Sequence, residues 1–241
     1  MRILGVDTAT STASVALIED EALLAEEIYG AAAPGETKKN HAEIILPLIQ
    51  SLLSRARVAL ADLSGIAVSI GPGSFTGLRI GLATVKGLVY DSGLPAVGVS
   101  TLLATAATAA RSDGAVCALL DARKREVYFG LFRWEGKTLC AIGGETVTSI
   151  QTAVESLRPH ASAGAPLLAV GDGARVYEKI LRDALDGGLT LAKEGKSSVA
   201  AQAAFLARER LACAASDDVG GLLPVYLRRP EAESKKMIPS R

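Results

Sequence analysis

The chain has 241 residues, 49% of them hydrophobic, which is enough for one large domain or two small ones that share a cleft. Its 26 basic and 26 acidic residues cancel, which excludes a surface that is basic throughout and binds nucleic acid by charge alone. An aromatic content of 4% argues against a stacking platform for single-stranded nucleic acid.

Other features of the sequence predict the compartment. Cys117, Cys140 and Cys213 lie far apart, which favours free thiols over a disulfide framework or a zinc site. A charged residue follows within residues 1–7, too early to leave room for the apolar segment of a signal peptide. No apolar run approaches the roughly 20 residues that cross a bilayer. We therefore expect a soluble cytoplasmic protein with no membrane partner.

The first half of the chain predicts three strands followed by alternating helices and strands. Asn40 and Glu43 have capping-box spacing and should begin a helix, which Pro47 should kink. The expected strands and their helices, in chain order, are strands 2–6, 14–18 and 22–29, the helix after Asn40, strand 66–70, a helix to about residue 90, strand 95–99 and helix 101–110.

The second half repeats this order of elements, with Ser149 and Ser197 as helix caps. The expected elements are strands 116–121, 126–134 and 138–148, helix 150–157, strand 167–170, helix 175–186, strand 189–191 and helix 197–213. Two successive patterns of this kind predict an α/β fold of two lobes, each a mixed sheet with helices outside. A cleft should lie between them at the carboxyl ends of the first strands. Residues 1–100 and 101–225 would form the lobes, with helix 197–213 free to pack back on the first, and 226–241 a basic tail.

The stretch Gly71-Pro-Gly-Ser-Phe-Thr-Gly-Leu-Arg-Ile-Gly-Leu82 predicts a turn that enters a helix with two apolar seams. One seam has large side chains: Leu78, Leu82, Val85 and Val89. The other has mostly small ones: Gly77, Ile80, Gly81, Thr84, Gly87 and Leu88. Each interior glycine costs roughly 0.5–1 kcal/mol relative to alanine, so the small seam should have a packing role. We favour contact with a helix of another subunit; a central helix buried on both sides within one fold explains the pattern as well. The turn lacks the ending of a P-loop, so it indicates phosphate binding only weakly.

Small and hydroxyl residues follow the first strand in Asp7-Thr-Ala-Thr-Ser-Thr12, and Asp121 ends the equivalent strand of the second lobe. The candidate nucleotide or phosphate residues are Asp7, Thr8, Thr10, Ser11, Asp121, Gly171, Asp172 and Gly173. Two aspartates facing each other across a cleft are typical of phosphoryl-transfer proteins of the actin and sugar-kinase type, with the Gly171-Asp172-Gly173 turn beside an adenosine. A tight threonine-rich hairpin would have the same sequence pattern.

Metal and hydrolase motifs are missing from the sequence. His41 and His160, the only histidines, lack the spacing of a zinc site, and no Gly-x-Ser-x-Gly elbow is present. The candidate RNA contacts are the basic runs at Arg123, Lys124, Arg125, Arg228 and Arg229. Such runs are more often solvated turns and ends than contacts to a phosphate backbone.

Several motifs together resemble the bacterial TsaB (YeaZ) family over nearly the whole chain. They are Ile3-Leu-Gly-Val-Asp-Thr8, the Gly71–Leu82 element, Pro95-Ala-Val-Gly-Val-Ser100, Asp121-Ala-Arg123, Glu126-Val-Tyr128 and Pro224-Val-Tyr-Leu-Arg228. The Gly71–Leu82 element is the most specific of them. The resemblance implies two ribonuclease-H-like lobes of the actin-like, sugar-kinase-like ATPase fold. It also implies a part in forming threonylcarbamoyladenosine next to the anticodon of tRNAs that read ANN codons.

In this family TsaB pairs with the catalytic TsaD subunit and recruits the ATPase TsaE. TsaD-like chains place a His-x-x-x-His metal pair after the strand equivalent to 95–99, where this chain reads Ser100-Thr-Leu-Leu-Ala104. The resemblance therefore implies a non-catalytic scaffold, an inactive homologue of the glycoprotease-like proteins, with no catalytic residues and no metal of its own. It would pair with TsaD, with TsaE or, when alone, with a second copy, and meet tRNA mainly through the complex.

The expected partner interface consists of His41, Ile45, Gly77, Leu78, Ile80, Gly81, Thr84, Gly87 and Leu88. Whether ATP or ADP with magnesium binds at a subunit interface is left open. The alternatives are an ATP-dependent small-molecule kinase or ATPase of the same fold and, less favoured, a metalloprotease.

Overall fold

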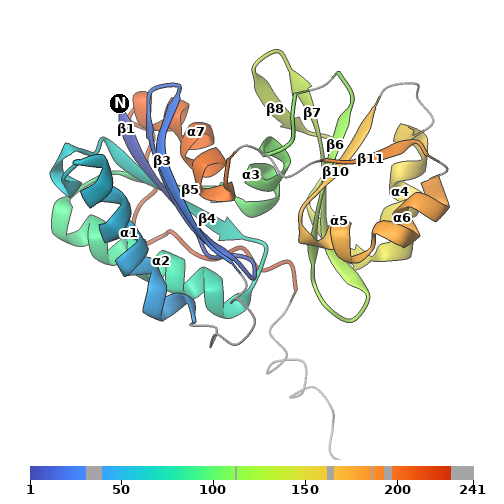
Figure 1. The fold of residues 1–241 in the computed structure, drawn as a ribbon, viewed down its shortest axis with the longest axis horizontal. Coiled ribbons are helices and arrows are strands. Elements are labelled where there is room, and N and C mark those ends of the chain that lie inside the picture. The colour runs from blue at the N-terminus through green and yellow to red at the C-terminus, as the bar shows by residue number, and fades with distance from the viewer. Residues whose placement is uncertain (31–39, 112, 162–165, 186, 193–196, 229–241) are drawn as a thin grey trace, which may run out of the picture.

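A computed structural model describes residues 1–30, 40–111, 113–161, 166–185, 187–192 and 197–228. The loop predicted at 31–39 and the candidate RNA contact Arg229 lie outside these ranges. The molecule has two lobes, each built on one sheet (Figure 1).

The first lobe has a five-stranded sheet in the order β3-β2-β1-β4-β5. Its strands are β1 (Arg2–Asp7), β2 (Ala13–Glu19), β3 (Ala22–Tyr29), β4 (Gly65–Gly71) and β5 (Ala96–Ser100). β1 pairs antiparallel with β2 and parallel with β4. The helices α1 (His41–Ala56) and α2 (Phe75–Ser92) cover one face of this sheet, and a 3-10 turn (Leu60–Asp62) follows α1. Alternate residues of each strand therefore enter two separate cores.

The second lobe repeats this topology in the order β11-β10-β6-β7-β8, with β9 also pairing with β7. Its strands are β6 (Ala115–Asp121), β7 (Glu126–Glu135), β8 (Thr138–Ala141), β9 (Thr146–Ser149), β10 (Leu167–Val170) and β11 (Leu189–Leu191). Its helices are α3 (Thr101–Ala107), α4 (Ile150–Ala161), α5 (Asp172–Val176) and α6 (Glu178–Leu185). β6 pairs antiparallel with β7 and parallel with β10, as β1 does with β2 and β4. This repeat confirms the predicted two-lobed α/β fold.

The last helix, α7 (Val199–Ala212), crosses back and covers the second face of the first sheet. Its buried face is rich in alanine, which lets the helix lie close to the strands. A Cβ placed on Gly5 would lie 2.0 Å from the carbonyl oxygen of Ala200, so β1 requires glycine at that point. The small residues of α7 and Gly5 thus allow a close contact between segments at opposite ends of the chain.

Three local details differ from the sequence prediction. The strand expected at 138–148 is two strands, β8 and β9, separated by a turn in which Gly143 has a φ of +91°. The helix expected at 175–186 is interrupted at Tyr177, which ends α5 in a non-helical conformation. The cap of α7 is Ser198, not Ser197, since its hydroxyl accepts from the Ala201 N–H at 3.2 Å. The Asn40 cap is confirmed, with the Glu43 N–H donating at 3.1 Å.

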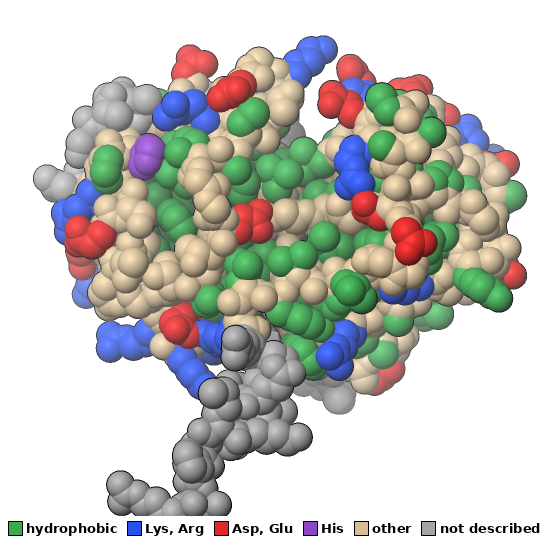
Figure 2. Space-filling view, turned by 180° about the vertical axis from the view of Figure 1, so that it is seen from behind, with side chains coloured by type: hydrophobic (Ala, Val, Ile, Leu, Met, Phe, Trp, Pro, Cys, Tyr) green, Lys and Arg blue, Asp and Glu red, His purple; other side chains and the backbone are tan. Residues whose placement is uncertain are grey.

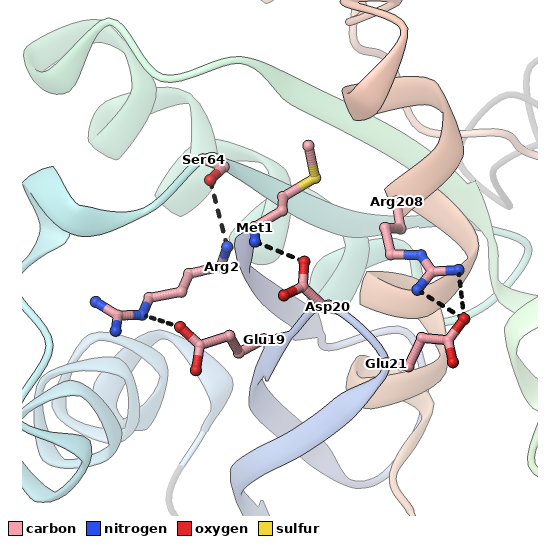
Figure 3. Close-up of polar contacts among 7 residues, drawn as sticks. All are labelled: Met1, Arg2, Glu19, Asp20, Glu21, Ser64 and Arg208. Atoms are coloured by element: carbon pink, nitrogen blue, oxygen red, sulfur yellow. Dashed lines mark hydrogen bonds and ion pairs between the residues drawn. The ribbon is translucent and has the colours of Figure 1, made fainter.

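Polar contacts hold the start of β1 beside the β2–β3 turn (Figure 3). The Met1 amino group lies 2.7 Å from Asp20, and the Arg2 guanidinium donates to Glu19 at 2.8 Å. These pairs are partly exposed, so solvent screens them and their contribution to stability is small. No helix within the described ranges is long and apolar enough to span a membrane.

Candidate functional site in the interlobe cleft

The turn after β1 lies in a groove on α2 that only glycine can form. A Cβ on Gly77 would lie 2.0 Å from the Thr8 carbonyl oxygen, and one on Gly81 would lie 2.3 Å from the Thr8 hydroxyl oxygen. A Cβ on Gly73 would lie 2.3 Å from the Ala9 carbonyl oxygen. The Thr8 hydroxyl donates to the Gly77 carbonyl at 2.7 Å, which fastens the turn to the helix. The glycine spacing therefore serves contact within the chain.

This finding corrects part of the predicted partner interface. Gly77 and Gly81 are buried against the chain's own Thr8, and Leu78 and Ile45 lie in its core with 0% and 1% of their surface exposed. These four residues cannot present a surface to another subunit. The prediction that Leu78, Leu82, Val85 and Val89 are buried is confirmed.

The remaining interface candidates are at least partly exposed: His41, Ile80, Thr84, Gly87 and Leu88. Leu46 and Tyr90 are exposed side chains on the same pair of helices that the predicted interface did not include. Leu46 on α1 is 51% exposed and Tyr90 on α2 is 93% exposed. A helical wheel of α1 could have shown that Leu46 is a large apolar side chain on the exposed face of an amphipathic helix.

A cavity of about 620 Å³ lies between the lobes at the carboxyl ends of β1 and β6. Thr10, Ser11, His41 and Ser74 are among the residues that line it from the first lobe, and Asp121, Arg123, Tyr128 and Asp172 from the second. The predicted cleft is therefore present, and it brings together candidates from both lobes.

Asp7 differs from its predicted role because it does not line this cavity. Its carboxyl is 1% exposed and accepts the Ala9 N–H at 3.3 Å. Burial raises the pKa of Asp7 to about 6, hydrogen bonding lowers it in part, and the charge of Asp172 across the cleft adds to the rise. The facing pair expected from Asp7 and Asp121 is thus wrong in detail, because only Asp121 reaches the cavity.

The two carboxylates at the cavity both belong to the second lobe. The Asp121 N–H donates to Asp172 Oδ1 at 3.0 Å, which places Asp172 beside the end of β6. Burial raises the pKa of Asp172, while hydrogen bonds from the backbone at Asp121 and Gly173 oppose the rise. Gly171 and Gly173 pack on the backbone of β6, where a Cβ would lie 2.2 and 2.9 Å from Leu119 atoms. The absence of a side chain at both positions therefore allows this turn to lie close to the sheet, and Gly171 also has a φ of +102°.

A second cavity, of about 360 Å³, adjoins the first and shares Thr10, Ser11 and Asp172 with it. Hydroxyl side chains dominate its polar lining: Thr10, Ser11, Thr12, Ser14, Thr105, Thr108, Ser197 and Ser198. The Thr105 hydroxyl is buried and has no partner among the described residues. Thr8, also a nucleotide candidate, lies in neither cavity lining and instead anchors the turn to α2.

Part of the turn after β1 is already engaged by contacts within the chain. The Ala9 N–H is directed at Asp7 and the Thr12 N–H at the Thr10 hydroxyl, so part of the turn's anion-binding capacity is already used. Asp7 is enclosed, so of the two aspartates predicted to face each other only Asp121 lines the cavity. Binding of ATP or ADP at an interface with a second subunit stays a prediction.

The basic run Arg123-Lys124-Arg125 forms the tight turn between β6 and β7, as the sequence indicated. All three residues have positive φ, between 54° and 64°, which L-residues adopt at a cost. The Arg123 N–H donates to Asp121 at 2.9 Å, which supports this conformation and places Arg123 at the cavity. A turn held in a costly conformation beside a cleft is a feature of functional sites.

The C-terminal segment 217–228 ties the two lobes together, a contact that sequence reasoning missed. The Val225 N–H donates to the Ile70 carbonyl at 2.7 Å, and the Tyr226 ring stacks on Phe75 at 4.9 Å between centroids. Arg228 then reaches the second lobe, donating to the Ala122 carbonyl at 2.7 Å and pairing with Glu126. The Arg228 side chain is thus engaged within the chain, which weighs against its role as an RNA contact.

Replacing Arg228 by methionine should loosen this tie between the lobes. The variant loses a hydrogen bond from a charged donor and a partly exposed ion pair, so we expect a loss of about 1–2 kcal/mol in the free energy of unfolding. Hydrogen exchange at the Val225 amide should become faster while amides of β1 are unchanged. The control is Arg133→Met, which changes an exposed arginine of β7 that makes none of these contacts. Equal exchange at Val225 in both variants would show that Arg228 does not hold the segment.

Comparison with solved structures defines the class of the fold. A ROK hexokinase from Thermus thermophilus superposes with a TM-score of 0.51 at 14% identity, covering 88% of this chain and 100% of that chain. The fold is therefore of the actin-like, sugar-kinase-like type, with two lobes around a cleft.

Closer similarities identify the family. A YeaZ structure from Pseudomonas aeruginosa has a TM-score of 0.72 at 27% identity, covering 94% of this chain and 99% of that one. The family model for TsaD, tRNA N6-adenosine threonylcarbamoyltransferase, matches residues 18–236. The Bacillus subtilis protein TsaB, named for tRNA threonylcarbamoyladenosine biosynthesis, is 33% identical over 242 residues, 98% of this chain and 97% of its own. Escherichia coli TsaB is 40% identical over 150 residues, 59% of this chain and 62% of its own. The chain belongs to the TsaB (YeaZ) family, within the broader group that the TsaD model describes.

Proposed function

We propose that this chain is the non-catalytic dimerising subunit of an assembly that forms threonylcarbamoyladenosine in tRNA. In this proposal it pairs with TsaD, which carries out the transfer, and the ATPase TsaE joins the same assembly. Similarity to TsaB proteins named for this pathway supports the role in biosynthesis. Contact with tRNA comes mainly through the assembly, with the Arg123–Arg125 turn at the cleft as the site of any direct contact.

The observation that carries the non-catalytic role is the start of α3. There TsaD-like chains have a pair of metal-binding histidines, whereas here Ser100 caps the helix by accepting the Leu103 N–H at 3.2 Å. The Thr101 hydroxyl accepts the Gly71 N–H at 3.1 Å, and Leu102 and Ala104 are fully buried. These side chains hold the helix in the interior. None of them is a histidine that could hold a metal ion, and it is the metal ion that would polarise a carbamoyl group.

The proposed contact surface is the outer face of α1 and α2, which lie side by side at the edge of the first lobe (Figure 1). It includes the exposed Leu46 and Tyr90, with Ile80, Thr84 and Leu88 partly exposed beside them. A helix pair with exposed apolar side chains suits packing against a similar helix pair of TsaD, or of a second copy when the chain is alone. The buried Gly77 and Gly81 contribute indirectly, by holding α2 against the turn after β1.

Changing Leu46 to aspartate tests this surface. The substitution places a charge in the apolar contact but leaves the core intact, because Leu46 is half exposed. We expect the Kd for TsaD, measured by titration calorimetry, to rise about 30-fold or more while the melting temperature is nearly unchanged. The control is Leu24→Asp on β3, a leucine that is 45% exposed and lies off the two helices, and it should change Kd less than twofold.

Two results would contradict the proposal. Wild-type affinity of the Leu46→Asp variant would mean that TsaD binds elsewhere on the chain. Transfer of threonylcarbamoyl to tRNA by this chain without TsaD would refute the non-catalytic role. A small-molecule kinase would instead show a shift in melting temperature with millimolar ATP and magnesium, and turnover of ATP.

A further inference from the structure

A groove between the lobes, separate from the cleft, has the features of a binding site for a small ligand. Its volume is about 570 Å³, and it shares no lining residue with the two cleft cavities. It lies among β5, α3, α7 and the β7–β8 hairpin. At the top of Figure 2 hydrophobic side chains gather in the hollow between the lobes, with charged side chains at its rim. The volume is within the range of about 300–1,000 Å³ typical of small-molecule sites.

The walls of the groove are apolar, and Trp134 is their largest side chain. The other apolar side chains come from both lobes: Val97, Val99, Leu103, Ala107, Leu139, Phe205 and Leu206. Trp134 is the only tryptophan of the protein. Its indole Nε1 is buried and has no acceptor among the described residues. A buried N–H without an acceptor is unfavourable in a folded protein.

The charges at the rim favour an anion. The Arg111 guanidinium lies 4.4 Å from the centre of the Trp134 ring, and neither it nor Lys137 has an acidic partner in the part of the chain that the structure describes. The other charged groups are largely compensated. Arg208 pairs with Glu21 at 3.4 Å (Figure 3), Arg210 pairs with Asp217, and Glu209 is the remaining acidic side chain of the lining.

Binding of an extended peptide strand to the adjacent edge of β5 is blocked. Asp217 accepts the Gly98 N–H at 2.7 Å and donates its own N–H to the Ala96 carbonyl at 2.9 Å. The Arg210 guanidinium covers the Gly98 carbonyl at 3.4 Å. With the strand edge satisfied by the chain itself, the groups that the groove offers a ligand are its apolar walls and two cations.

We propose that this groove binds a small amphipathic anion, with an aromatic or aliphatic body against Trp134, Leu103 and Phe205. The carboxylate, sulfonate or phosphate of the ligand lies at Arg111 and Lys137. This site is independent of the proposed pairing with TsaD, because it uses neither α1 nor α2.

The test uses the fluorescence of Trp134 with two probes of similar shape and different charge. The anionic probe is 8-anilino-1-naphthalenesulfonate and the neutral one is N-phenyl-1-naphthylamine. We expect the anion to quench Trp134 by energy transfer with saturable 1:1 binding, and to bind more tightly than the neutral probe. Arg111→Gln should weaken binding of the anion about tenfold and of the neutral probe less than twofold. The control Arg133→Gln, at the neighbouring exposed position of β7, should change neither.

Several results would overturn the proposal. They are quenching that does not saturate, equal affinity for the two probes, and an equal loss for both probes in Arg111→Gln. Displacement of the bound anion by TsaD would assign the groove to a protein partner instead.

Discussion

Replacing Gly77 by alanine should destabilise the protein by about 3 kcal/mol or more, an unusually large loss for adding one methyl group. The new Cβ would lie 2.0 Å from the Thr8 carbonyl oxygen and 3.3 Å from His41 Nδ1. The obstruction at Thr8 is backbone, so the turn after β1 and helix α2 must move apart. That movement would also break the hydrogen bond of 2.7 Å between the Thr8 hydroxyl and the Gly77 carbonyl. Urea unfolding followed by circular dichroism measures the loss.

Gly87→Ala is the matched control on the same helix. A Cβ at Gly87 meets no atom within 4 Å, so only the helical preference of alanine acts. We expect this variant to be more stable than the wild type by roughly 0.5–1 kcal/mol. A Gly77→Ala variant as stable as the wild type would mean that the glycine groove is not required for folding. If Gly77→Ala folded stably and lost only its affinity for TsaD, Gly77 would be a subunit contact, as the sequence predicts.

The second large effect is the pH dependence that Asp7 imposes on stability. Its pKa is about 6 in the folded protein because burial disfavours the charged carboxylate, compared with 3.8 for an ordinary aspartate. The folded state therefore holds the proton more tightly than the unfolded state. The stability from protonated Asp7 is fully present below about pH 4 and is lost as pH rises through about 6, a change of about 3 kcal/mol.

Asp7→Asn isolates this contribution, because asparagine is neutral at every pH and keeps an oxygen for the Ala9 N–H. Urea unfolding from pH 4 to pH 8 should show a fall in wild-type stability that is smaller in the variant by about 3 kcal/mol. Burial also raises the pKa values of Asp172 and Glu145, so part of the fall persists in Asp7→Asn. If the free energy of unfolding fell equally with pH in both proteins, Asp7 would ionise as readily in the folded state as in the unfolded state.

The element order of each lobe follows from local sequence signals. Alternating and continuous apolar runs located the strands, and Asn40 and Ser149 marked helix starts because a side-chain oxygen can accept an orphan N–H there. The predictions differ from the structure where tertiary contacts determine the local conformation. Tyr177 interrupts the helix expected at 175–186, and its hydroxyl lies 3.5 Å from Asp121, a partner 56 residues away.

The candidate site was predicted only in part. Thr10, Ser11, Asp121 and Asp172 do meet at the cleft, because the strands that precede them end at the same edge of their sheets. Asp7 has the same position relative to its strand but is covered, which depends on how the turn after β1 packs on α2. The groove at Trp134 could not be found from sequence, since its walls come from elements with no shared motif.

The sequence by itself determined the two-lobed α/β architecture, the order of strands and helices within each lobe, and the lack of histidines at residues 100–104, directly after β5. These properties depend on residue type and on spacing along the chain, which are local. Only the tertiary structure decided that Gly77 and Gly81 face Thr8 of the same chain, that α7 covers the first sheet, and that residues 217–228 join the lobes. A helical wheel shows that a face is small or apolar, but which surface covers that face depends on contacts between residues far apart in sequence.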